Sequence, residues 1–101
     1  MAKVIVIGGG PAGIMAAITA AKNNEVILIE RNNEIGKKLK LTGGGRCNIT
    51  NNRDIEEFFS KIVTNNKFLY SALYTFSNYQ LLEYLSEKGL EYKVEYDEKV
   101  Y

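Results

Sequence analysis

Two glycine-rich segments contain the residues whose types and spacing point to ligand binding. The first, Gly8 to Gly13, fits the pattern Gly-x-Gly-x-x-Gly, in which small residues let a backbone turn approach a phosphate group closely. Glu30 follows Gly13 by seventeen positions, where a carboxylate typically lies beside the ribose of a dinucleotide. The pattern and the spacing together predict a site for the adenosine diphosphate part of such a ligand.

Each small residue of the first segment has its own predicted task. Gly8 permits the tight turn, Gly10 leaves the backbone open to a pyrophosphate, and Gly13 allows a helix to pack closely on the preceding strand. Pro11 and Ala12 open that helix, where a proline costs no hydrogen bond. Aligned peptide dipoles place roughly half a positive charge at a helix N-terminus, so this end favours phosphate without a lysine.

Glu30 and its neighbour Arg31 complete the first candidate site. A carboxylate here would accept hydrogen bonds from ribose hydroxyls and would repel a 2′-phosphate, so FAD or NAD is favoured over NADP. The simpler interpretation is a solvated charge at the end of a strand. The glycines upstream favour the ribose role.

A βαβ unit is predicted to position these residues. The β-branched run Val4 to Ile7 predicts a strand at residues 3–7, buried on both faces as in a parallel sheet. Residues 11–22 are alanine-rich with apolar residues on a helical repeat, and residues 25–30 form a second apolar run. A right-handed crossover would set the two strands parallel, so the fold class is α/β and Rossmann-like.

The second glycine-rich segment belongs to a predicted long loop at residues 31–53, and such loops are usually functional or disordered. Its run Gly43–Gly45 beside Arg46 suggests backbone brought against a planar or anionic ligand. Nearby lysines either form a solvated basic face or place one ammonium near the pyrophosphate, with Lys38 and Arg46 the best candidates. The lysines of this loop are Lys37, Lys38 and Lys40.

Residues 54–101 are predicted to form helices and a terminal hairpin, beside a nucleotide-binding part at residues 1–53. Alternation over residues 90–96 predicts a half-exposed strand, and Asp97-Glu98 predicts a turn into a returning strand. The aromatic residues fit core packing better than a platform for nucleic acid. The helix signals are the capping pairs Asp54 with Glu57 and Ser77 with Gln80, the apolar stripe at residues 68–76, and Gly89 as a left-handed cap.

Composition and charge exclude several classes of function. The chain has 46% hydrophobic and 25% charged residues and a net charge of +1, which is typical of a soluble globular protein without a polyanionic partner. Cys47 is the one cysteine and histidine is absent, so we predict no metal site, no redox-active thiol pair and a reducing cytoplasm. Glycines interrupt the first apolar run, so neither a signal peptide nor a membrane span is predicted.

The glycine-rich segments and Glu30 resemble the BaiN/RdsA-type NAD(P)/FAD-dependent oxidoreductases, most specifically through residues 43–51, Gly-Gly-Gly-Arg-Cys-Asn-Ile-Thr-Asn. The resemblance covers the whole chain, although family members are several times longer and usually carry a glycine where Asn24 stands. It implies an FAD-binding domain with a smaller inserted domain, and hydride transfer through the flavin between NAD(P)H and a small-molecule substrate. The matching residues are Gly8, Gly10, Gly13 and Glu30 for the cofactor turn, a lysine at Lys38, and Gly44, Gly45, Arg46, Cys47 and Asn48 for a flavin-side loop.

Two alternatives stay open. The same βαβ pattern also serves NAD-dependent dehydrogenases, although the loop at residues 43–51 favours a flavin. The other alternative is a truncated chain that folds poorly and binds nothing, because further strands of the sheet would come from the remainder of a parent chain. We expect the 101 residues alone to be inactive, and they predict neither a catalytic residue nor a particular substrate.

Overall fold

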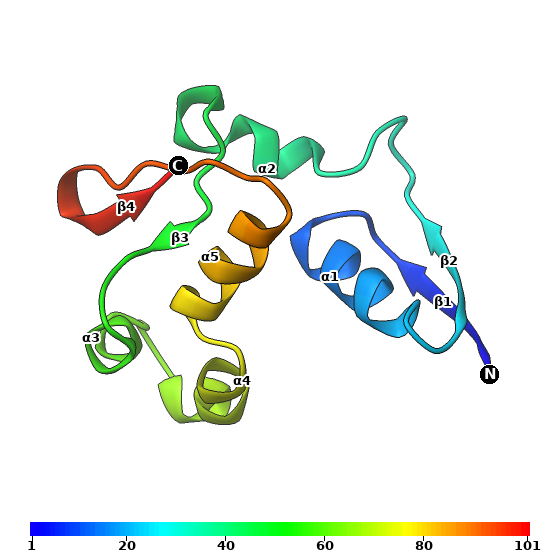
Figure 1. The fold of residues 1–101 in the computed structure, drawn as a ribbon, viewed down its shortest axis with the longest axis horizontal. Coiled ribbons are helices and arrows are strands. Elements are labelled where there is room, and N and C mark those ends of the chain that lie inside the picture. Colours follow the sequence, from blue (N-terminus) through cyan, green and yellow to red (C-terminus); the bar gives the residue numbers. More distant parts are fainter. The chain divides into compact units, whose positions relative to one another are not determined.

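The computed structural model describes all 101 residues and shows an α/β chain with two compact units. Unit 1 comprises Met1–Cys47 and unit 2 comprises Asn48–Tyr101 (Figure 1). The predicted α/β class is therefore confirmed. No helix combines the length and the apolar character that crossing a membrane requires.

Unit 1 is the predicted βαβ unit. Strand β1 (Lys3–Ile7), helix α1 (Pro11–Ala20) and strand β2 (Glu25–Ile29) follow one another, and the two strands pair in parallel, with Lys3 opposite Glu25 and Ile7 opposite Ile29. The Gly8 amide continues this ladder by donating to the Ile29 carbonyl at 2.8 Å. The elements agree with the prediction, and only the ends of α1 and β2 lie slightly earlier than expected.

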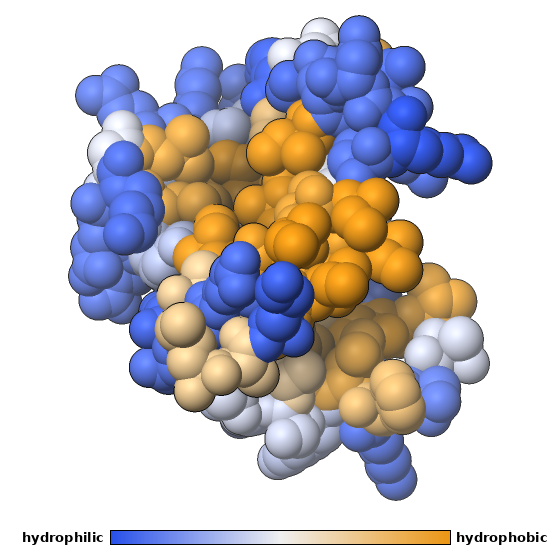
Figure 2. Space-filling view, turned by 90° about the vertical axis from the view of Figure 1, so that its right-hand side faces the viewer, coloured by the Kyte–Doolittle hydropathy of each residue, from blue (hydrophilic) through white to orange (hydrophobic).

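The two faces of this sheet differ, which corrects one expectation. Side chains alternate along both strands between half-buried and exposed, and the half-buried face meets α1 beside Gly13, whose ideal Cβ position lies 3.6 Å from Val6. Burial of β1 on both faces was wrong for this chain, because α1 packs on only one face. Figure 2 shows hydrophobic residues gathered in the middle of the face that it draws. The exposed isoleucines of the other face are Ile5, Ile7, Ile27 and Ile29.

The segment predicted as one long loop, residues 31–53, contains regular structure. Helix α2 spans Lys37–Leu41, a 3₁₀ turn spans Thr42–Gly45, and strand β3 spans Thr50–Asn51. Lysine and leucine are good helix formers, so five of them in succession form a helix once Gly36 has turned the chain in the left-handed region at φ 68°. The glycines had suggested irregular structure throughout.

After β3, unit 2 continues with helices, and the predicted starts of two of them are confirmed. The Asp54 side chain accepts from the Glu57 amide at 3.0 Å, and Ser77 and Gln80 cap each other reciprocally. Gly89, at φ 94°, lies just beyond the last helix, which is the predicted left-handed cap. The helices are α3 (Ile55–Ser60), a 3₁₀ turn at Asn66–Leu69 followed by α4 (Tyr70–Thr75), and α5 (Asn78–Glu87).

The terminal hairpin is confirmed but is shorter than predicted. The chain reverses in a 3₁₀ turn at Tyr96–Glu98 and returns as β4 (Lys99–Val100), with the Lys93 amide donating to the Tyr101 carbonyl at 2.9 Å. Strand β4 also pairs antiparallel with β3. Residues 90–92 lie outside this ladder, whose outermost pair joins Lys93 to Tyr101.

We expect Gly13→Ala to destabilise unit 1. A Cβ at this position would lie 1.8 Å from the Gly8 carbonyl oxygen, so α1 would have to move away from β1. Alanine gains about 1 kcal/mol of helix propensity, but overpacking against backbone costs typically 1–3 kcal/mol. We expect the clash to outweigh the gain, so the free energy of unfolding should fall. The free energy of unfolding in urea measures it. Gly10→Ala is the control, because its Cβ would meet nothing within 4 Å; equal stability of the two variants would contradict the packing argument.

Candidate functional site

The N-terminus of α1 leaves backbone donors open. Gly10 is the N-cap, Pro11 is the first helical residue, and no side chain caps this end or adds an acidic group in the first turn. The first amide bonded within the helix is that of Ile14, which donates to the Gly10 carbonyl at 2.9 Å. The amides of Ala12 and Gly13 precede it, so they belong to the orphan donors of a helix start, which attract anions.

The glycines of this turn have different surroundings. A Cβ on Gly9 would lie 2.8 Å from the Ile35 side chain, and one on Gly13 would strike the Gly8 carbonyl. Gly10 is different, because its Cβ would enter open space and its φ of −79° suits any residue. Packing within the chain therefore explains the glycines at 9 and 13, whereas nothing in the chain requires a glycine at 10.

The Glu30 carboxylate holds the turn to the end of β2. Its Oε1 accepts from the Gly9 amide at 2.8 Å and its Oε2 from the Asn32 amide at 2.7 Å. These two backbone hydrogen bonds, first that of Asn32 and then that of Gly9, lower the pKa of Glu30 from its ordinary value, aided by the charge of Arg31. An ionised carboxylate offers about four acceptor sites, so two amides leave capacity for further donors.

Gly9 connects three parts of unit 1, and the sequence did not single it out. Its amide donates to Glu30, and its carbonyl accepts from the Gly36 amide at 2.7 Å. Asn32, which binds the second oxygen of Glu30, was also missed. The glycine pattern leaves position 9 unspecified, so only its place between two pattern glycines could have drawn attention to it.

The second glycine-rich segment turns sharply through left-handed backbone. Gly43, Gly44 and Gly45 have φ values of 60°, 66° and 91°, and a Cβ on Gly44 or Gly45 would enter open space. The backbone bonds are local, since the Cys47 amide donates to the Thr42 carbonyl at 3.1 Å. The loop thus presents bare backbone, which suits close contact with a ligand.

The charged candidates around this loop differ in their contacts. Arg46 folds back, with its Nε donating to the Gly43 carbonyl at 3.1 Å. Lys40 pairs with Glu34 at 3.2 Å, which makes it a poorer anion ligand than Lys38. The side chains of Arg31 and Lys38 are exposed, Cys47 is a half-buried free thiol, and Asn48 is the first residue of unit 2.

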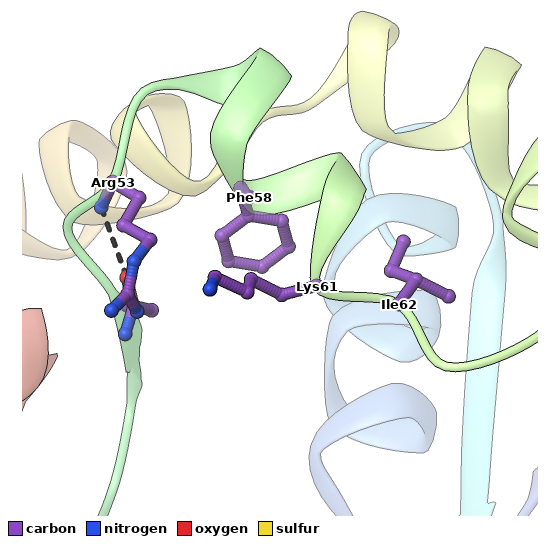
Figure 3. Close-up of a pocket in the computed structure, with 5 residues that line it drawn as sticks. Arg53, Phe58, Lys61 and Ile62 are labelled. Atoms are coloured by element: carbon purple, nitrogen blue, oxygen red, sulfur yellow. Dashed lines mark hydrogen bonds between the residues drawn. The ribbon is translucent and has the colours of Figure 1, made fainter.

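A pocket of about 240 Å³ lies within unit 2 and contains none of the predicted site residues. In Figure 3 the Lys61 side chain runs below the Phe58 ring toward Arg53. Arg53 is already committed, because its Nε donates to Glu57 at 3.1 Å and its guanidinium pairs with Asp97. The carboxylates of Glu57 and Asp97 therefore offset the positive charge of Arg53. The lining residues are Asn51, Arg53, Phe58, Lys61 and Ile62.

We expect the stability of unit 1 to depend on the ionisation of Glu30. Because the pKa is lowered in the folded chain, the carboxylate stabilises the fold above its unfolded pKa, and this contribution disappears as pH falls through the folded pKa. Wild type should therefore exceed Glu30→Gln in stability at neutral pH, and the gap should close in acid. Denaturation midpoints at a series of pH values, with the carboxyl ¹³C shift of Glu30, measure this. A gap independent of pH would contradict it.

Comparisons with known proteins give several relatives of this chain. Over 54 residues, half of this chain, it is 48% identical to the 3-dehydro-bile acid delta(4,6)-reductase of Clostridium scindens. Over 89 residues, 87% of this chain, it is 33% identical to the ribosomal RNA dihydrouridine synthase of Haemophilus influenzae. A segment of 40 residues, 39% of this chain, is 55% identical to the NADH oxidase of Thermoanaerobacter brockii.

These relatives are much longer than the chain. The matched segments make up 13%, 22% and 6% of their respective lengths, so the chain corresponds to a fraction of each. The HI0933-like protein Rossmann domain, by contrast, matches residues 2–101, almost the whole chain. Together with the parallel βαβ unit and its glycine-rich turn, this match shows that the chain belongs to the HI0933-like Rossmann domain family.

Proposed function

We propose that the chain binds the adenosine diphosphate part of FAD, as a portion of a longer flavin-dependent oxidoreductase that moves hydride from NAD(P)H to a small organic substrate. The observation that carries the proposal is Gly10. Nothing in the chain occupies the space that its side chain would take, and it adjoins an uncapped helix N-terminus. A glycine at that place suits a turn that meets a pyrophosphate.

Different residues of unit 1 would bind different parts of the cofactor. The orphan amides of Ala12 and Gly13 would bind the pyrophosphate. Glu30, anchored through Gly9, would accept hydrogen bonds from the adenosine ribose with its remaining lone pairs. The flavin, when bound, supplies the hydride chemistry, and the chain contributes binding and orientation.

The charge of unit 1 supports an anionic ligand. Within Met1–Cys47 there are seven lysines and arginines against three glutamates and no aspartate. Such an excess of positive charge attracts a diphosphate and speeds its encounter with the protein. Lys38, exposed on α2, and Arg31, beside Glu30, are the cations that we assign to this role.

The loop with Gly44 and Gly45 supports FAD over NAD. Its bare left-handed backbone suits a flat ligand, and we assign Gly44 to Asn48 to the flavin side. The names of the relatives, a reductase and an NADH oxidase among them, support redox chemistry. The ribosomal RNA dihydrouridine synthase shows that substrates differ among similar proteins.

Titration of the parent protein with FAD and with NAD tests the proposal. We expect FAD to bind and to remain after desalting, with a flavin absorbance band at about 450 nm and quenched flavin fluorescence, because the flavin would be held against protein. NAD should bind more weakly in the absence of FAD. A correctly folded parent protein that takes up NAD and no FAD would contradict the proposal and favour a dehydrogenase.

We expect Gly10→Val to remove FAD while leaving the fold intact. The backbone at position 10 accommodates a branched residue, but the added atoms would occupy the space required by the pyrophosphate. The readouts are flavin retained per protein and the thermal midpoint. Ala16→Val is the matched control, since Ala16 lies exposed on the same helix and should keep its flavin. Undiminished flavin in Gly10→Val would show that the turn has no contact with the cofactor.

A further inference from the structure

We propose that Asn78 is a positioning residue for the flavin-side loop, because it fixes the backbone that directly follows Asn48. This inference rests on the proposed function, in which Gly44 to Asn48 face the flavin. The hydrogen bonds from which it is argued all lie within unit 2. Asn78 is the first residue of α5 and is 3% exposed, so its polar atoms are shielded from water.

Both hydrogens of the Asn78 side-chain amide are used on the same stretch of chain. Nδ2 donates to the Asn51 carbonyl at 2.6 Å and to the Arg53 carbonyl at 2.7 Å. Carbonyl oxygens only accept, so the orientation of the amide is fixed: a reversed amide would place Oδ1 against two other oxygens. Oδ1 itself is buried without a hydrogen-bond donor in the chain. Both donor hydrogens of the Asn78 side chain therefore bind the backbone of residues 51 and 53.

The same stretch is also held from β4 and from the turn that precedes it. The Ile49 amide donates to the Val100 carbonyl and the Asn52 amide to the Glu98 carbonyl, each at 2.8 Å. The Tyr79 hydroxyl donates to the Asn52 carbonyl at 3.0 Å. Residues 49–53 are thus hydrogen-bonded both to the terminal hairpin and to the first turn of α5.

Asn48 is joined directly to this anchored stretch at Ile49, and a glycine-rich turn precedes it in the chain. Gly43–Gly45 precede it within five positions, and glycine backbone has wide conformational freedom. The hydrogen-bonded stretch at residues 49–53, by contrast, begins at the residue next to Asn48. The hydrogen bonds of residues 49–53 therefore restrain Asn48 from its C-terminal side, and Asn78 is the buried side chain that makes two of them.

Asn78→Asp separates positioning from helix formation. The substitution keeps the shape of the side chain, and a carboxylate at a helix start is favourable for the helix itself. It nevertheless replaces two donors by acceptors that face the carbonyls of Asn51 and Arg53. We expect α5 to persist and the stretch at residues 49–53 to loosen.

The experiment uses the parent protein with Asn78→Asp, and Asn23→Asp as the control because Asn23 is exposed in the turn after α1. The readouts are the thermal midpoint, hydrogen exchange of the Ile49 and Asn52 amides, FAD affinity and the flavin reduction potential. In Asn78→Asp both amides should exchange faster, FAD affinity should fall about ten- to a hundredfold, and the potential should shift. The control should match wild type in all four.

Three outcomes would overturn the proposal. If the amides exchange faster while FAD affinity and potential stay unchanged, Asn78 is structural only. If exchange is unchanged, the stretch at residues 49–53 does not depend on Asn78. If wild type shows protected amides but binds no FAD, the proposed function fails and the positioning role with it. Should Asn78→Asp not fold, Asn78→Ser, which keeps one donor, must show the same changes at smaller size, and their absence in a folded Asn78→Ser counts against the proposal.

Discussion

The hydrogen bond from the Gly9 amide to the Glu30 carboxylate is the constraint on which the rest of unit 1 depends. It joins the turn after β1 to the end of β2 at 2.8 Å, and the Gly9 carbonyl receives the amide of Gly36 from the segment before α2. Three separate segments of the chain therefore meet at Gly9, which has no side chain. The bond also fixes the direction of Glu30, so a residue that would otherwise be a solvated charge becomes part of a defined site.

This constraint separates two reasons for a glycine in the same turn. At Gly9 and Gly13 the chain itself fills the space, with Ile35 and the Gly8 carbonyl as the neighbours. At Gly10 the space is open, and a requirement for glycine there would have to come from outside the chain. A glycine pattern read from sequence contains both kinds without distinguishing them, and the structure divides them by what a Cβ would touch.

Local signals in the sequence were sufficient for most elements. The apolar runs predicted β1 and β2, and the pair Ser77 and Gln80 predicted the start of α5, because these patterns act over a few residues. The contacts that build the candidate site are not local: Gly9 to Glu30 and Asn78 to Asn51 each span more than twenty positions. The exposed face of the sheet was missed for a related reason, since periodicity shows that a face is apolar but not what covers it.

Unit 2 shows how polar contacts can order a chain that has little interior. Its buried apolar side chains are Leu82 and Val100, too few for apolar burial alone to specify one arrangement of the hairpin. The turn at Asp97 is in the left-handed region at φ 60°, which is unfavourable for most residues other than glycine. Arg53 offsets this cost by pairing with the Asp97 side chain and donating to its carbonyl at 3.3 Å, and the same pairing lowers the pKa of Asp97. Since Asn78 holds the Arg53 carbonyl, one polar network links α5, the stretch after β3 and the terminal turn.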